Sequence, residues 1–512
     1  MNERTGGKGK VYLVGAGPGD PGLITLKALE CLRQADVVVY DFLASPALLR
    51  HVPPEAELVY AGKKGAQHTL NQEEINQLIV TRANEGRTVV RLKGGDPFIF
   101  GRGGEEAEEL ARAGVSFEVV PGVTSAIAAP AYAGIPLTHR KYASSVGFVT
   151  GHEDPSKPES ALDWDRIASG LDTLVFLMGV RNLPVITAQL IQAGRDAATP
   201  AALIRWGATP DQATLEGTLA DIASRAEAQG LKPPAVLVVG EVVRLRSKLN
   251  WFETLPLFGR TIMVTRTRRQ ASVLTGALSG LGAKVMECPL IRLVPPDDWG
   301  PVDKAIDDLT EFDWLILTSP NGVEFLFRRL FERGKDARSL APVRLAVIGP
   351  ATAEKLGSYG LRADLVPEEY VAEGLAKALI SVGISGQKVL LARAAQARAA
   401  LAEELFAARA SVREVTLYQT LPPEDMPPEA RLALEREDLD VVAFTSSSTV
   451  TNLVELLGDR TPGLLSRVRA ACIGPITART AREAGLNVVA EAKEYTVRGL
   501  VAAIKDYCHR SA

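Results

Sequence analysis

The chain reads Arg91-Leu-Lys-Gly-Gly-Asp-Pro-Phe-Ile-Phe-Gly-Arg-Gly-Gly-Glu105 directly after the apolar run Thr88-Val-Val90, which predicts a strand that runs into a long glycine-rich loop. A loop so poor in side chains can bring bare backbone amides against a ligand, and its cations can hold an anionic one. The alternative is an ordinary connector, but flexible linkers rarely interleave an acid, a proline and two phenylalanines among their glycines. We therefore expect a binding site at the end of this strand.

Length and composition are typical of a soluble α/β protein of more than one domain. A chain of 512 residues exceeds the usual size of a single core, and its net charge of −3 gives no basic region for nucleic acid. The four cysteines have no CxxC or metal-like spacing, so no metal is expected. No apolar run is long enough to span a membrane and the N-terminus has no signal-peptide core, so we expect a cytoplasmic protein.

The segment 249–259 interrupts the pattern before a fresh strand at 261–265, and the main domain boundary is expected there. On both sides, short strands rich in Val, Ile and Leu alternate with alanine-rich helical stretches. This alternation is typical of α/β proteins with mostly parallel sheets.

The C-terminal half contains an internal repeat. Val343-Arg-Leu-Ala-Val-Ile-Gly-Pro-Ala-Thr-Ala353 reappears as Val468-Arg-Ala-Ala-Cys-Ile-Gly-Pro-Ile-Thr-Ala478, and the same offset relates Tyr370 to Tyr495. Two copies predict two similar α/β lobes that face one another. Ligands of open α/β sheets collect at strand ends, where each copy has Thr-Ser and Ile-Gly-Pro-x-Thr-Ala.

The first strand of the chain ends in Gly15-Ala-Gly-Pro-Gly-Asp20, which resembles a dinucleotide fingerprint but departs from it. Asp20 stands where GxGxxG requires a glycine, and Pro18 lacks the amide that would meet a pyrophosphate. An acid at this turn also repels phosphate. The pattern favours an uncharged or cationic ligand, such as a sulfonium with an adenosine tail.

Six motifs in this order resemble the tetrapyrrole methylases, specifically the S-adenosylmethionine-dependent uroporphyrinogen-III C-methyltransferases, over about Lys10 to Phe252. They are Gly15-Ala-Gly-Pro-Gly-Asp20, Val38-Val-Tyr-Asp41, the loop 91–105, Val120-Pro-Gly-Val-Thr-Ser125, Gly134-Ile-Pro-Leu-Thr-His-Arg140 and Phe176-Leu-Met-Gly179. The resemblance implies a fold of two α/β subdomains over 10–252, S-adenosyl-L-methionine as methyl donor, S-adenosyl-L-homocysteine as its product, and a homodimer through this half.

The same resemblance implies site residues. Asp41 is the implied proton acceptor and Lys63 the proton donor, although both could be exposed surface charges. Arg102, Arg140 and Lys141 are candidates for binding the eight carboxylates of the substrate, because Arg offers a bidentate fork. Met178 by itself could be a core methionine. The implied cofactor contacts are Pro18, Gly94, Gly95, Asp96, Ile99, Thr124, Ser125, Met178 and Gly207.

The two-lobed repeat resembles uroporphyrinogen-III synthase over about 258–508, with looser motifs. That enzyme closes hydroxymethylbilane with inversion of the last ring. Tyr418 is the candidate acid, and the alternative is a tyrosine that only packs. The candidate hydroxyl and backbone donors to the acidic substrate are Thr318, Ser319, Thr352, Ser446, Ser447 and Thr477.

The resemblances together imply a bifunctional enzyme that makes uroporphyrinogen III and methylates it twice, at C2 and C7, to precorrin-2 for sirohaem or cobalamin. One alternative is a methylase of a later corrin precursor. Another makes the C-terminal half a non-catalytic ligand-binding module, because two-lobed α/β repeats also serve as sensors.

Overall fold

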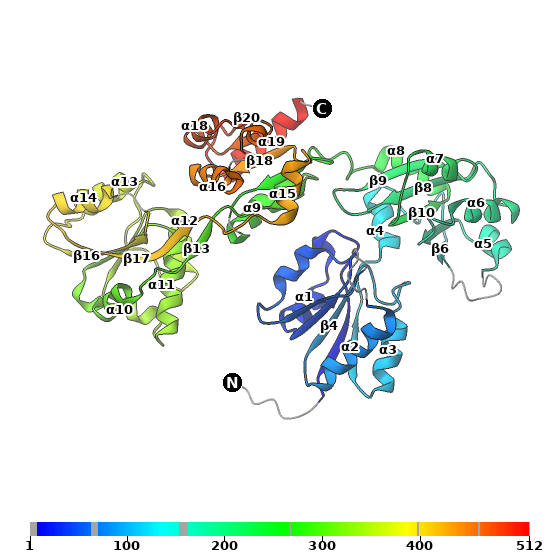
Figure 1. Cartoon of the computed structure of the whole chain (residues 1–512), viewed down its shortest axis with the longest axis horizontal. Helices are drawn as coiled ribbons and strands as arrows, with labels where there is room; N and C mark the ends of the chain where they lie inside the picture. The colour runs from blue at the N-terminus through cyan, green and yellow to red at the C-terminus, as the bar shows by residue number, and fades with distance from the viewer. Residues whose placement is uncertain are drawn as a thin grey trace. The chain divides into compact units, whose positions relative to one another are not determined.

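The computed structural model describes residues 8–62, 70–152, 162–266, 268–396, 399–458 and 461–510, without the side chains of 268–272 and 461–462. The chain divides into two compact units, one up to Thr261 with Ala277–Lys284 and the last few residues, the other with the remainder. The described residues form four five-stranded sheets with helices packed on them (Figure 1). The α/β class predicted from the sequence is confirmed.

The first sheet is parallel throughout and has the order β3-β2-β4-β1-β5. Apolar cores cover both faces, as expected for an all-parallel sheet. Its loops therefore gather at the carboxyl ends of the strands, where ligands of such sheets bind. The elements are β1 (Lys10–Gly15), α1 (Leu26–Arg33), β2 (Val37–Tyr40), β3 (Glu57–Tyr60), α2 (Gln72–Asn84), β4 (Val89–Lys93), α3 (Gly103–Arg112) and β5 (Ser116–Val120).

The second sheet has the order β6-β7-β10-β8-β9, and only β6 and β7 pair in parallel. The expectation of mostly parallel strands is wrong for this sheet, because the connection 206–212 is too short for a crossover helix and makes a hairpin instead. The elements are α4 (Ser125–Tyr132), β6 (Val146–Thr150), α5 (Trp164–Gly170), β7 (Thr173–Leu177), α6 (Leu183–Gln192), β8 (Pro200–Arg205), β9 (Ala213–Thr218), α7 (Ile222–Ala228), β10 (Ala235–Val239) and α8 (Arg246–Leu249).

The C-terminal half has two lobes, each with one sheet. The first has the order β12-β11-β18-β19-β20 and the second β13-β17-β16-β14-β15. The strands are β11 (Thr261–Val264), β12 (Lys284–Glu287), β13 (Arg292–Val294), β14 (Trp314–Leu317), β15 (Arg344–Val347), β16 (Lys388–Ala394), β17 (Ser411–Leu421), β18 (Val441–Phe444), β19 (Arg469–Cys472) and β20 (Asn487–Glu491). The first lobe therefore contains strands from both ends of this half, β11, β12 and β18 to β20, and the second lobe contains the strands between them, β13 to β17.

The helices of this half follow the same path. They are α9 (Arg268–Ser279), α10 (Gly300–Asp307), α11 (Pro320–Glu332), α12 (Pro350–Gly357), α13 (Ala372–Ser381), α14 (Ala400–Ala407), α15 (Pro428–Glu435), α16 (Ser447–Leu457), α17 (Thr461–Leu465), α18 (Pro475–Glu483) and α19 (Val497–Arg510). Each lobe combines elements from both sequence copies, because β11 pairs with β18, and β14 pairs with β16. The lobes are thus not the repeats themselves.

The repeat is nevertheless visible in equivalent local structure. Gly349 precedes α12 and Gly474 precedes α18, and each packs against the ring of the matched tyrosine, Tyr370 or Tyr495. A Cβ on Gly474 would lie 3.0 Å from the Tyr495 ring. The same close approach in both copies explains why both positions are glycine.

Further properties bear on the functional class. Among the described residues, no helix has the length and apolar character that crossing a bilayer requires, and no cluster of three metal-ligating side chains occurs. All four cysteines are buried thiols. Burial raises the pKa of Cys288 and of Cys472 to about 12, so these thiols stay protonated at neutral pH.

Candidate active sites of the two halves

The loops after β1 and β4 are joined at the carboxyl edge of the first sheet. Gly17 donates to the carbonyl of Gly95 at 3.2 Å, and Gly95 donates to the carbonyl of Gly17 at 2.7 Å. Both glycines have positive φ, +76° and +69°, a conformation that side-chain-bearing residues rarely adopt. The glycine-rich loop is therefore a defined structure.

Three glycines from different strand ends pack backbone against backbone beside this bridge. A Cβ on Gly122 would lie 2.3 Å from the Gly95 carbonyl oxygen, and a Cβ on Gly15 would lie 2.5 Å from the Gly122 Cα. The glycines at 15 and 122 are thus required by the protein's own packing. The sequence analysis had explained the glycines of the loop 91–105 by the approach of a ligand, and it offered no packing reason for Gly15 or Gly122.

Asp96 ties this loop to the loop after β5. Its Oδ1 accepts from Phe98 N at 2.8 Å and its Oδ2 accepts from Gly122 N at 3.0 Å. A carboxylate accepts about four hydrogen bonds, so Asp96 keeps capacity for a ligand amine. Gly94 lies beside it, where a Cβ would be 2.4 Å from the Leu43 Cβ.

Residues with left-handed backbone gather at the strand ends of this half. Phe100, Arg102, Met178, Trp206 and Ala208 have φ between +49° and +61° although none is glycine. Such strain costs free energy and is concentrated at functional sites. These residues come from the loops after β4, β7 and β8, which also carry the predicted cofactor contacts Gly94, Gly95, Asp96, Ile99, Met178 and Gly207.

Two predicted apolar contacts are solvent-exposed. Met178 is 51% exposed at the end of β7, and Ile99 is 37% exposed on the glycine-rich loop. The alternative that Met178 is a core methionine is therefore wrong. Exposed apolar side chains at strand ends are what an adenosine would cover.

The remaining predicted contacts lie at the start of α4 and behind it. Thr124 is the N-cap residue, and its hydroxyl accepts from Ala126 N at 3.3 Å, with Ser125 as the first helical residue. A Cβ on Gly207 would lie 2.2 Å from the Ala129 Cβ, so Gly207 packs directly on the helix.

Pro18 lies on the loop that ends at Asp20, and this acid has two structural contacts. It caps the turn by accepting from Gly22 N at 2.7 Å, and it accepts from the Tyr132 hydroxyl at 2.6 Å. Burial and this bond raise the pKa of Tyr132. The acid therefore links the first loop to α4, a role that sequence reasoning did not find.

Asp41 follows β2 and is partly exposed, with both carboxylate oxygens engaged. Its Oδ1 accepts from Leu43 N at 3.1 Å, and its Oδ2 lies 3.5 Å from Arg91 Nη2. The predicted proton donor Lys63 lies outside the described residues. Asp41 is thus presented at the same sheet edge as the glycine loops.

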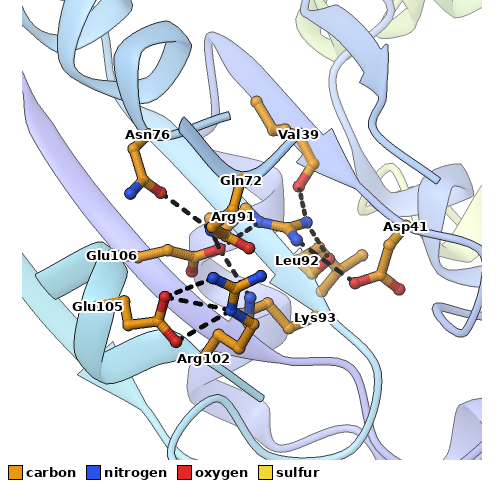
Figure 2. Close-up of polar contacts among 10 residues, drawn as sticks. All are labelled: Val39, Asp41, Gln72, Asn76, Arg91, Leu92, Lys93, Arg102, Glu105 and Glu106. Atoms are coloured by element: carbon orange, nitrogen blue, oxygen red, sulfur yellow. Dashed lines mark hydrogen bonds and ion pairs between the residues drawn. The ribbon is translucent and has the colours of Figure 1, made fainter. Parts of the chain in front are cut away.

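A buried charge cluster lies on the β4 face that α2 and α3 cover (Figure 2). Arg91 and Lys93 both bond to Glu106 of α3. The expectation that all the cations of this stretch are available to an anionic ligand is therefore wrong for these two. This cluster was missed as a candidate site.

The predicted substrate cations are exposed. Arg102 precedes α3 and forms an ion pair with Glu105 at 2.6 Å. Arg140 and Lys141 lie in the turn that the paired residues His139 and Ala143 close. Surface ion pairs contribute little to stability, so the Arg102 pair can reorganise around a carboxylate ligand at small cost.

In the C-terminal half, Tyr418 of β17 is buried and contacts the start of α11. Its hydroxyl lies 3.0 Å from the Ser319 hydroxyl, and its ring stacks on Phe325 with centroids 5.3 Å apart. Ser319 also caps α11 by accepting from Gly322 N. Thr318 immediately precedes it, so these predicted residues lie together.

The matching position of the other copy has the same helix start. Ser446 is the N-cap of α16, and its hydroxyl lies 3.0 Å from that of Ser448. Ser447 accepts from the Thr480 hydroxyl at 3.1 Å. Thr352 and Thr477, by contrast, are buried side chains in the first turns of α12 and α18.

Comparisons with known proteins divide the chain in the same way. The family described as Tetrapyrrole (Corrin/Porphyrin) Methylases matches residues 10–223, and that described as Uroporphyrinogen-III synthase HemD matches residues 272–502. Porphyrin biosynthesis protein HemD of Ruminiclostridium josui is 39% identical over 94% of this chain and 95% of its own length. Uroporphyrinogen-III C-methyltransferase of Priestia megaterium is 55% identical over 46% of this chain and 98% of its own.

Among solved structures, the uroporphyrin-III C-methyl transferase from Thermus thermophilus complexed with S-adenyl homocysteine is 43% identical. It covers 46% of this chain and 100% of its own, with a TM-score of 0.40.

Proposed function

The chain belongs to the tetrapyrrole methylases in its N-terminal half and to the uroporphyrinogen-III synthases in its C-terminal half, and we propose that the second half makes the substrate of the first. It is a bifunctional enzyme with uroporphyrinogen-III synthase and uroporphyrinogen-III C-methyltransferase activity. In the proposed sequence, hydroxymethylbilane is cyclised with inversion of its last ring. The product is then methylated at C2 and C7 to precorrin-2.

S-adenosyl-L-methionine is the proposed methyl donor, and it supplies an electrophilic methyl group on sulfur. The observation that supports it is the joined pair of glycine loops that carries Asp96 and Ile99, together with the exposed Met178 in the same unit. Asp96 suits an ammonium group, and the two exposed apolar side chains suit an adenosine. Asp20 at the first loop disfavours a phosphate.

We propose the following roles for the chain's own groups in methyl transfer, and the role of Lys63 rests on the family resemblance alone. Asp41 accepts a proton from the macrocycle as a ring carbon is methylated, and Lys63 returns one. Arg102, Arg140 and Lys141 bind carboxylates of the substrate. These exposed cations fix the orientation of the ring, which brings one carbon in line with the methyl group.

The free thiols fit an enzyme of a reducing compartment that acts on small molecules. We propose a cytoplasmic location, supported by four buried thiols. We also propose a homodimer through the methylase half.

The experiment for the double function uses the full chain. Hydroxymethylbilane alone should give uroporphyrinogen III. Added S-adenosylmethionine should raise the product mass by two CH2 units, because each transferred methyl group replaces a proton. If hydroxymethylbilane gives the uninverted isomer as the sole product, this result would contradict the synthase activity and favour a ligand-binding module. Unmethylated uroporphyrinogen III with the cofactor present would favour a methylase of a later precursor.

Gly122→Ala should weaken cofactor binding. The new Cβ would lie 2.3 Å from the Gly95 carbonyl oxygen, and both are backbone positions that cannot move independently. Overpacking of this kind costs about 1–3 kcal/mol and would displace the joined loops. Calorimetry should show lower affinity for S-adenosylhomocysteine. Gly104→Ala is the control, because no described atom lies within 4 Å of its added Cβ; equal losses in both would contradict the packing explanation.

Tyr418→Phe should lower synthase turnover by about 10²-fold, the low end for loss of a general acid. The ring would still stack on Phe325, so the hydroxyl alone is tested. Ser319→Ala is the comparison, because it removes the hydrogen-bond partner of the Tyr418 hydroxyl and leaves the Tyr418 phenol in place. Initial rates of uroporphyrinogen III formation measure both. Unchanged turnover in Tyr418→Phe would assign this tyrosine to packing.

A further inference from the structure

Two cations of β4 lie inside the protein. Arg91 and Lys93 are two residues apart on a strand, so both point to the face covered by α2 and α3, which otherwise packs a mostly apolar core. Their exposed fractions are 3% and 4%, and that of Glu106, which faces them from α3, is 0%. Buried charges persist only when they are paired, so this group is a single electrostatic unit.

One oxygen of Glu106 holds the unit together. Its Oε1 accepts from Lys93 Nζ at 2.7 Å, from Arg91 Nε at 3.1 Å and from Gln72 Nε2 at 3.1 Å. Its Oε2 is buried and accepts no hydrogen bond from any residue that the structure describes. Three donors that converge on one atom fix the direction from which the Arg91 side chain leaves Glu106 (Figure 2).

The rest of the Arg91 guanidinium reaches the carboxyl edge of the sheet. Its Nη1 donates to the carbonyls of Val39 and Leu92, both at 3.3 Å, and its Nη2 lies 3.5 Å from Asp41 Oδ2. Leu43 N holds the other oxygen of Asp41. The rigid, planar guanidinium thus connects a fully buried carboxylate to a carboxylate that solvent reaches.

The charges of this connection balance, with two cations and two carboxylates. Burial and Arg91 lower the pKa of Lys93, whereas Glu106 raises it. A purely structural ion cluster would need no link to Asp41. The Arg91 guanidinium is oriented so that it contacts the carbonyls of Val39 and Leu92 and the carboxylate of Asp41 at once. A cluster with a purely structural role does not explain this orientation.

We propose that Arg91 is a positioning residue of the methyl-transfer site, which holds the Asp41 carboxylate in its working orientation and is itself held by Glu106. This inference rests on the proposed role of Asp41 as proton acceptor. Arg91 touches neither substrate nor cofactor and acts through Asp41 alone. Lysine at this position keeps the charge but lacks the fork that makes the separate contacts.

A double-mutant cycle in the full chain tests this. Arg91→Lys and Asp41→Asn are each expected to lower kcat for methylation of uroporphyrinogen III, the former by about 10²-fold, as for a small misplacement of a reacting group. The double variant should be no slower than Asp41→Asn alone, because a residue that acts through another has no effect once that other is removed. The dissociation constant for S-adenosylhomocysteine should stay unchanged in all three.

Arg246→Lys is the matched control. Arg246 is also buried, and it bonds to Glu216, to Glu253 and to the carbonyl of Ala133. It is expected to lower the melting temperature and to leave kcat unchanged. An equal loss of kcat in this control would overturn the proposal, because any buried Arg would then suffice.

The outcomes separate the inference from its premise. If Asp41→Asn keeps the wild-type kcat, the proposed role of Asp41 fails. If Asp41→Asn is slow and Arg91→Lys slows it further by the same factor as it slows the wild type, the positioning role fails. Should Arg91→Lys lose S-adenosylhomocysteine binding through misfolding, Glu106→Gln provides a second cycle with the same expectation, because a neutral amide oxygen holds the Arg91 guanidinium less firmly than the carboxylate does.

Discussion

Asp41→Asn is expected to lower kcat for methylation by about 10²–10⁴-fold, the range for loss of a positioned general base. Asparagine keeps an oxygen that can accept from Leu43 N, so the turn after β2 should persist. The substitution removes the negative charge and the basic oxygen that faces Arg91. Calorimetry should find the affinity for S-adenosylhomocysteine unchanged, because the joined glycine loops do not depend on this carboxylate.

The matched control for this prediction is Asp172→Asn. Asp172 also accepts from loop amides, those of Ser144 and Ser145, but it lies in the second sheet's loops. Methylation by this variant should proceed at the wild-type kcat. A wild-type rate in Asp41→Asn would remove Asp41 from proton transfer.

The sequence motifs placed the predicted cofactor contacts directly after strands, but they did not explain why each residue type is there. The glycine loops, Met178 and the start of α4 all belong to one unit and directly follow strands. The glycines at 15, 122 and 207, however, are explained by contacts within the protein. A glycine motif shows that something approaches the backbone closely, and only coordinates show whether that is a ligand or another strand.

The sequence contains a pattern that could have predicted the burial of Arg91 and Lys93. Arg91 and Lys93 were expected in the glycine-rich loop, but both lie in β4. There they alternate with the apolar Val90 and Leu92, and period-two alternation places both cations on one face. Their carboxylate partner Glu106 lies in the helix that follows the loop. Which face is covered is set by helix packing that a single sequence does not reveal, so the cations were assigned to the ligand instead.

The C-terminal repeat shows a similar limit. Equivalent positions such as Gly349 and Gly474 were found correctly, because local backbone geometry dictates local sequence. The composition of each lobe was not predicted. Pairing of β11 with β18 joins segments far apart in the chain, and strand order is a long-range property that repeat periodicity does not encode.

Removal of the buried carboxylate should have the largest effect on stability. Glu106→Leu removes the carboxylate that both buried cations, Arg91 and Lys93, bind, and it leaves Arg91 with its pair to Asp41 at 3.5 Å. Breaking a buried pair in this way costs about 3–5 kcal/mol. Scanning calorimetry of the full chain measures this loss of stability. The unfolding transition of the methylase half is the one whose melting temperature rises when S-adenosylhomocysteine is added, because the ligand stabilises the part that binds it.

Lys93→Met combined with Glu106→Leu should recover much of that loss. The pair then replaces a buried cation and a buried carboxylate by apolar side chains, and Arg91 keeps Asp41 as its counter-charge. Glu241→Leu is the reference, because its ion pair with Arg244 is exposed and should contribute about 0–1 kcal/mol. If Glu106→Leu cost no more than this reference, or if the double variant were less stable than Glu106→Leu, the cluster would not be held by charge. If the double variant regains stability, the destabilisation of Glu106→Leu comes from unbalanced charge. Loss of packing would not explain that result, because the cavity volume changes little between the single and the double variant.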